Sequence, residues 1–161
     1  VTVLFAKGIQ NIAYLGSNMD QMVNRCRYQG YEEAYRKGKR KLNPDLVYTD
    51  LSSRVMVEKA VEELKKSGVE CILCQDDYIC DEVVRKLSRM GVRIPDQMKV
   101  ASCHYSRILE NYPITITSLK FNITELGRRS CQVLLDLIHG KTVPDKTLLD
   151  YEIILKESTK G

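Results

Sequence analysis

The sequence predicts an α/β fold: a doubly wound, mostly parallel sheet with helices on both faces. Segments with strand and helix patterns alternate along the whole chain, as expected when crossover helices pack on a parallel sheet. The clearest stretch is 88–105, where a helix ends at Gly91, Pro95 prevents its continuation, and residues 100–103 are small enough for a strand buried on both faces. This strand delivers His104 to the carboxyl edge, where open α/β sheets bind ligands.

The first half of the chain has three predicted strands, at 11–16, 45–49 and 70–75. A helix over 22–39 separates the first two, and its expected apolar side consists of Val23, Cys26, Ala34 and neighbouring tyrosines. A second helix is capped by Ser52 or Ser53 and ended by Gly68. Its apolar positions repeat at helical spacing and are Val55, Val57, Ala60, Val61 and Leu64.

In the second half, Asp76 or Asp77 caps the helix that ends at Gly91. A fifth strand is predicted over 115–120, an amphipathic helix over 124–140, and a last strand over 147–155. The tail, 156–161, is polar, and we expect it to be frayed. Residues 1–8 resemble the last turns of a helix with its glycine stop, so we expect further residues before Val1 in the parent protein.

Composition is that of an ordinary soluble domain, with 161 residues, 43% hydrophobic and 29% charged, and a net charge of +4. No apolar run approaches the roughly 20 residues that span a bilayer, so we expect a cytoplasmic protein without membrane contact. The basic run at 36–41 is interpreted as a solvated helix end, because cations complement the helix dipole there, rather than as a nucleic-acid patch.

The six cysteines are expected to be free thiols that act as small core residues in a reducing compartment. Cys71, Cys74 and Cys80 have a spacing that suggests zinc, but Cys71 and Cys74 lie three apart on a strand and point to opposite faces. We therefore expect neither a metal nor a cofactor.

Several short motifs stand out by their order and spacing. They are Lys7-Gly8, N-I-A-Y-L-G (11–16), N-R-C-R-Y-Q-G-Y-E-E-A (24–34), Q-D-D (75–77), G-V-R-I-P-D (91–96), the segment 114–120, E-L-G (125–127) and E-S-T (157–159). In this order they resemble the effector-binding domain of the lactose-repressor (LacI/GalR) family of bacterial transcription regulators, which has the periplasmic-binding-protein type I fold.

The resemblance implies a ligand-sensing part of a transcription regulator rather than an enzyme. Residues 1–120 would form the carboxyl-terminal lobe. Residues 121–150 would form a helix and strand that cross back to the other lobe, and residues 151–161 would form the closing strand and tail. By this resemblance, the DNA-binding domain would lie outside this chain. The implied partners are a small-molecule effector (a sugar, sugar derivative or nucleobase), operator DNA through that domain, and a second copy in a homodimer. We expect the last helix to expose an apolar stripe, which consists of Leu126, Val133, Leu134, Leu137 and Ile138.

The resemblance also implies ligand positions. Arg27 matches an arginine that forks hydrogen bonds to hydroxyls or carboxylates, although a surface cation is the alternative. Gln75 and Asp76 end a strand where the family usually shows an asparagine and an aspartate; Asp76 is equally a helix cap.

His104 and Tyr105 stand where the family usually has a pair of aspartates. This replacement favours an anionic or aromatic ligand, or a site that no longer binds a ligand. Phe121 would either stack on the ligand or pack at the hinge between the lobes. Ser17 would either line the ligand site or form a turn after the first strand.

The sequence leaves four alternative functions. Two are a periplasmic-type sugar-binding protein and a ligand-independent regulator or dimerisation module. A thiol enzyme built on Cys103 and His104 is disfavoured, because neighbours on a strand face opposite ways and the sequence shows no carboxylate to orient His104. A phosphoacceptor receiver domain would end its fifth strand with a lysine such as Lys120, but Gly16-Ser17-Asn18 replaces the acidic pair it needs after the first strand.

Overall fold

A six-stranded sheet forms the centre of the molecule, described here for residues 1–160 by a computed structural model. The strands are β1 (Ile12–Leu15), β2 (Val47–Tyr48), β3 (Cys71–Cys74), β4 (Lys99–Ser102), β5 (Thr117–Phe121) and β6 (Tyr151–Ile154). Their order is β2-β1-β3-β4-β5-β6; the first five are parallel, and β6 runs antiparallel to β5. The predicted fold class is therefore confirmed.

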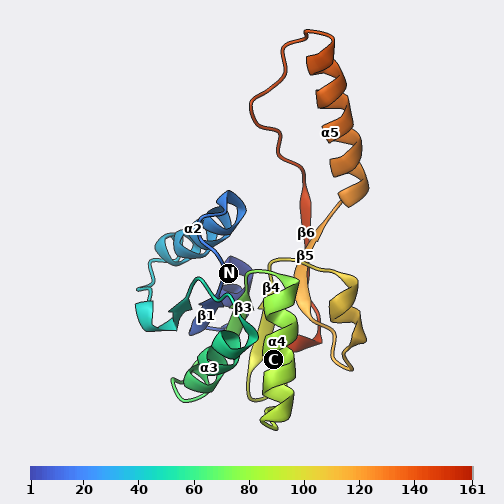
Figure 1. Cartoon of the computed structure of the whole chain (residues 1–161). Coiled ribbons are helices and arrows are strands. Elements are labelled where there is room, and N and C mark those ends of the chain that lie inside the picture. Colours follow the sequence, from blue (N-terminus) through green and yellow to red (C-terminus); the bar gives the residue numbers. More distant parts are fainter. Residues whose placement is uncertain (161) are drawn as a thin grey trace.

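Helices cover both faces of the sheet (Figure 1). The helices are α1 (Thr2–Ala6), α2 (Met22–Lys37), α3 (Arg54–Leu64), α4 (Asp77–Arg89) and α5 (Ile123–Ile138), with short 3-10 helices η1 (Pro44–Leu46), η2 (Arg107–Asn111) and η3 (Glu157–Thr159). One apolar cluster joins α1 and α2 to the sheet through Leu4, Tyr14 and Tyr31. A larger cluster joins α3 and α4 to the opposite face through residues such as Val61 and Val83.

Local signals position these elements as the sequence predicts. Ser53 caps α3 by accepting a hydrogen bond from the Met56 N–H, and Gly91 ends the α4 region with φ of +67°, a conformation that suits glycine. The peptide bond before Pro95 is cis. Cys71 and Cys74 belong to the clusters on opposite faces of the sheet, as their strand spacing predicts.

Some predicted core positions are wrong, because each helix buries only one stripe. In α2 the buried stripe runs through Asn24, Tyr31 and Tyr35, so Val23 and Cys26 are rotated away from it and are exposed. In α3, Val55 lies two residues before the buried Val57 and faces the solvent for the same reason. Cys131 is exposed as well, since α5 buries none of its residues.

Two further predictions need correction. The second strand is shorter than predicted, because residues 44–46 form η1 with Pro44 in its first turn. The tail is packed rather than frayed: Ser158 and Thr159 are buried, and Ser158 Oγ accepts from the Thr117 N–H (2.9 Å) and donates to the Val100 carbonyl (2.6 Å). Of the predicted tail, Gly161 lies outside the described residues.

Residues 122–150 form an arm that projects from the body (Figure 1). The arm consists of α5 and the irregular segment that returns to β6, and it joins the sheet only through β5 and β6. The predicted apolar stripe is exposed on α5 at Leu126, Leu134, Leu137 and Ile138, while Val133 is half-buried. Within residues 1–160, no helix is long and apolar enough to cross a membrane.

Candidate functional site

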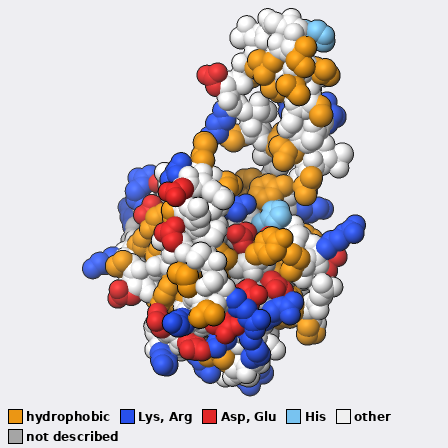
Figure 2. Space-filling view, in the orientation of Figure 1, with side chains coloured by type: hydrophobic (Ala, Val, Ile, Leu, Met, Phe, Trp, Pro, Cys, Tyr) orange, Lys and Arg blue, Asp and Glu red, His pale blue; other side chains and the backbone are white. Residues whose placement is uncertain are grey.

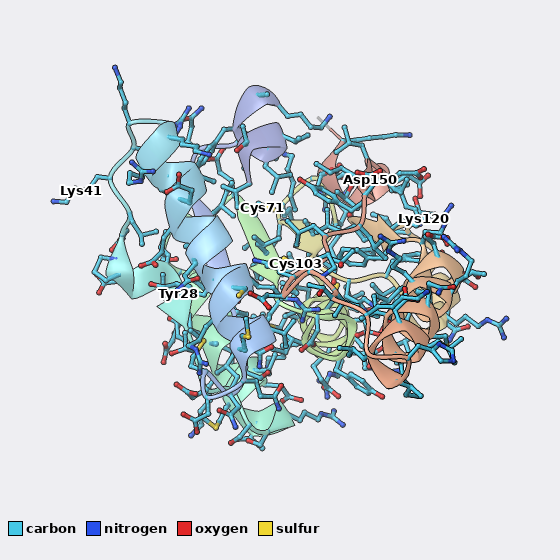
Figure 3. The ribbon with its side chains drawn as sticks, turned by 90° about the horizontal axis from the view of Figure 1, so that it is seen from above. Tyr28, Lys41, Cys71, Cys103, Lys120 and Asp150 are labelled. Carbon is cyan, nitrogen blue, oxygen red and sulfur yellow. The ribbon has the colours of Figure 1, made fainter. Side chains whose placement is uncertain are left out.

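The carboxyl ends of the parallel strands meet at one edge of the sheet, called here the carboxyl edge. Ser17 follows β1, Gln75 and Asp76 follow β3, His104 follows β4, and Phe121 is the last residue of β5. Neighbouring strands pair in register, so these residues reach the same edge. Viewed from above, Cys103 lies at this edge between α2, which carries Tyr28, and the base of the arm near Lys120 and Asp150 (Figure 3).

Gln75 is buried, and its side-chain amide is bonded inside the protein. Its Oε1 accepts from the Tyr14 hydroxyl (3.1 Å) and the Ser17 N–H (3.2 Å), and its Nε2 donates to Ser17 Oγ (2.9 Å). A Cβ at Gly16 would come within 2.7 Å of Gln75 Oε1, so the loop approaches the amide this closely only with glycine there. These contacts make Gln75 and Ser17 a brace between β1 and β3. Their ligand roles stay predictions.

Asp76 is the N-cap of α4. Its Oδ1 accepts a hydrogen bond from the Ile79 N–H (2.9 Å), which satisfies one of the free donors at the start of the helix. The capping role that the sequence predicts as one of two alternatives is therefore confirmed. Because the side chain is also half-buried at the carboxyl edge, a ligand contact through its other oxygen stays a prediction.

His104 is held by a carboxylate that sequence analysis did not assign to it. Its Nδ1 lies 3.2 Å from Oδ1 of Asp77, the first residue of α4, which is only 6% exposed. Burial raises the pKa of Asp77, but hydrogen bonds from Ser106 and His104 outweigh this effect and hold that pKa below its usual value. The pair fixes the imidazole, leaving Nε2 on the far side of the ring from Asp77.

Phe121 connects His104 to a cavity. The two rings are nearly parallel, at 24°, with centroids 6.4 Å apart. Phe121 also lines a cavity of about 380 Å³ between α2 and the β4–β6 part of the sheet. Arg27 and Cys103 line the same cavity. The structure thus places Arg27 and Phe121 at one cavity, and His104 beside Phe121 but outside the cavity lining.

Cys103 does not have the properties of a nucleophile. Burial raises the pKa of its thiol to about 11, and the nearby positive charge of Arg27 lowers it only in part. The expectation that no carboxylate orients His104 is wrong, since Asp77 does so. All six cysteines are free, and within residues 1–160 no group of three or more metal-binding side chains could hold an ion.

Comparison with known proteins identifies the family. A family model described as a periplasmic binding protein-like domain matches residues 1–159. The chain belongs to this family. Within it, the relatives of this periplasmic-binding-protein-like chain are transcription regulators of the lactose-repressor type.

Both the curated relatives and the similar solved structures are transcription regulators. The transcriptional regulator GntR of Pseudomonas aeruginosa is 28% identical to this chain, and the match covers 97% of this chain and 46% of GntR. The regulator RegA of Clostridium saccharobutylicum is 24% identical, and the match covers 98% of this chain and 48% of RegA. The chain thus spans about half the length of these relatives. The structure of CcpA of Lactococcus lactis superposes with a TM-score of 0.87 and 24% sequence identity, covering 99% of this chain and 59% of the CcpA chain. The structure of a CelR–cellobiose complex superposes with a TM-score of 0.86 and 24% identity, covering 98% of this chain and 49% of the CelR chain. These superpositions show a shared fold.

In this periplasmic-binding-protein-like chain, sequence reasoning missed Asp77 as the partner of His104 and Tyr14 as the partner of Gln75. A signal for Asp77 was present: β3 and β4 are neighbours, so residues following one strand end meet residues following the other. The contact of Tyr14 with Gln75 could not be predicted, because the sequence shows Tyr14 only as one of the buried positions of β1.

Proposed function

We propose that this chain is the ligand-sensing part of a LacI-type bacterial transcription regulator. A small molecule binds at the carboxyl edge and changes how the protein that contains this chain binds operator DNA. The observation that carries the proposal is the placement of Arg27 and Phe121 at one cavity, with His104 next to Phe121, in a fold shared with transcription regulators. The named relatives, all transcriptional regulators, support a non-enzymatic role.

The proposed division of the chain follows the arm. Residues 1–120 are one lobe, 121–150 cross to a second lobe, and 151–161 close the sheet. Ligand binding between lobes would change their closure and hence the placement of paired DNA-binding domains in a homodimer, a coupling between two sites. This arrangement also implies a cytoplasmic protein, because operator DNA is there.

The test is a thermal-shift screen of the full-length protein against sugars, sugar acids, sugar phosphates and nucleobases. A ligand that binds only the native state raises the melting temperature. We expect one chemical class to stabilise the protein and, at the same concentration, to change its affinity for operator DNA. Absence of stabilisation across the panel would contradict the proposal and favour a ligand-independent regulator.

A further inference from the structure

Arg27 is a half-buried arginine that has no partner among residues 1–160. Among residues 1–160, no ion pair or hydrogen bond joins its guanidinium to another residue, although it lines the cavity. Its neighbours on α2 differ: Arg25 donates to the carbonyls of Met19 and Asp20, and Arg36 pairs with Glu33. A guanidinium that is partly removed from water without an acceptor is unfavourable, so this position is suited to an acceptor that comes from outside.

The two carboxylates at the same edge have partners within the protein, and only the second oxygen of Asp76 remains open to a ligand. Asp76 caps α4 through Oδ1, and buried Asp77 accepts from His104 and Ser106. The residues that line the cavity include Arg27 as their one charged side chain and no Asp or Glu. The cavity therefore offers a positive charge without a carboxylate that would repel an acidic ligand. The second group is His104, whose Nδ1 faces Asp77 and whose Nε2 is therefore the nitrogen left for a ligand. With both ring nitrogens protonated, Nδ1 donates to Asp77 and Nε2 donates to an acidic ligand group.

Phe121 supplies the non-polar part of this neighbourhood. Its ring lies between the cavity that Arg27 lines and the imidazole of His104, and it is 38% exposed. A sugar ring or another ring with an apolar face can pack on such an aromatic surface.

We propose that the effector of this site carries an acidic group, a carboxylate or a phosphate, that Arg27 and His104 bind, while the body of the ligand packs on Phe121. The inference rests on the proposed function and adds the chemical class of the ligand. Arg27 acts as the specificity-determining residue, because its planar fork can bind two acceptor oxygens at once.

The experiment is calorimetric titration of the full-length protein with matched ligands: glucose, glucuronate and glucose 6-phosphate, and the same three forms of galactose. We expect an acidic member to bind at least about tenfold more tightly than its neutral counterpart, the scale of one charge-assisted hydrogen-bonded pair. Comparison of the uronic acids with the phosphates separates the two sources of negative charge.

Variants assign the effect to Arg27. Arg27→Gln should lower the affinity for the acidic ligand at least about tenfold and leave neutral ligands unchanged, and Arg27→Lys should restore part of the loss. Arg36→Gln, which removes the same charge from an exposed position of the same helix, is the matched control and should bind as wild type. Melting curves of the free proteins confirm that each variant is folded.

Two results separate the inference from the proposed function. If neutral sugars bind as tightly as their acids, or Arg27→Gln retains full affinity for the acid, the ligand class proposed here is wrong and the sensing function stands. If the acids and neutral sugars of this titration do not bind, and the nucleobases of the thermal-shift screen do not bind either, both are overturned.

Discussion

At the residue scale, the buried amide of Gln75 joins β3 to β1 and to the loop after it. Replacing Gln75 by alanine leaves the Tyr14 hydroxyl and the Ser17 N–H without their acceptor. We expect Gln75→Ala to lower the free energy of unfolding by about 1–3 kcal/mol, the cost of unsatisfied buried groups. Urea denaturation measures the loss, and Gln29→Ala at an exposed position of α2 is the control. Equal midpoints for the two variants would show that the amide network contributes nothing.

Asp77 gives a prediction about pH. Because its pKa is lower in the folded protein, its ionised form contributes stability that is fully present above the unfolded pKa of about 3.9 and is lost as the pH falls through the folded pKa. Asp77→Asn keeps an acceptor for His104 but has no charge. We therefore expect the difference in unfolding free energy between wild type and Asp77→Asn to be larger at pH 5–7 and to shrink below about pH 4.

Urea titrations at pH 7, 5 and 3 measure this difference. The control is Asp96→Asn, since the exposed Asp96–Arg93 pair should contribute no more than about 0.5 kcal/mol at any of these pH values. A difference for Asp77→Asn that does not depend on pH would contradict the assignment of a stabilising charge to Asp77.

The sequence predicted individual side chains where the cause is local. The Asp76 cap depends on a residue three positions away, so the sequence predicts it as one of two roles for Asp76. The Gln75 brace and the Asp77–His104 pair depend on residues far along the chain, so only the sheet order reveals them. Arg27 was found through its motif, but the absence of a partner for it within residues 1–160 needed the structure.

At the element scale, the predicted helix ends agree with the structure within a few residues, because caps and glycine stops are written in neighbouring residues. Strand edges and the tail were predicted less well. β2 is only two residues long, and η3 is ordered by β4 and β5, which lie some forty to sixty residues earlier. No local pattern distinguishes such a tail from a frayed one.

The tail connects β4 to β5 through hydrogen bonds. Its Ser158 hydroxyl joins the Val100 carbonyl to the Thr117 N–H, and both of those residues are buried. Ser158→Ala leaves this carbonyl and N–H unsatisfied, so we expect a loss of about 1–3 kcal/mol and faster hydrogen exchange at the Thr117 amide. Ser88→Ala, at an exposed site on α4, should change stability by no more than about 0.5 kcal/mol. Unchanged exchange at Thr117 would show that Ser158 is not its effective acceptor.

At the scale of the whole molecule, the body and the arm differ in what stabilises them. The body buries apolar side chains on both faces of the sheet, whereas α5 buries none, although its residues have the amphipathic spacing of a packed helix. Figure 2 shows hydrophobic side chains gathered along the arm. The sequence predicted this exposure, because the apolar stripe is visible in residues 126–138.

A purified solution of this chain contains only further copies to cover the stripe, so we expect residues 1–161 to self-associate, with a mass of a dimer or larger in sedimentation at tens of micromolar. Leu134→Glu combined with Leu137→Glu places two charges in the apolar stripe and should shift the chain to a monomer, because burying those charges without partners is unfavourable. Met22→Glu combined with Val55→Glu adds the same charges at exposed apolar positions of the body and should leave the association unchanged. A monomeric wild type would mean that the exposed stripe is too weak to drive association. Loss of association in both double variants would mean that the contact lies outside α5 or that added charge disrupts association in general.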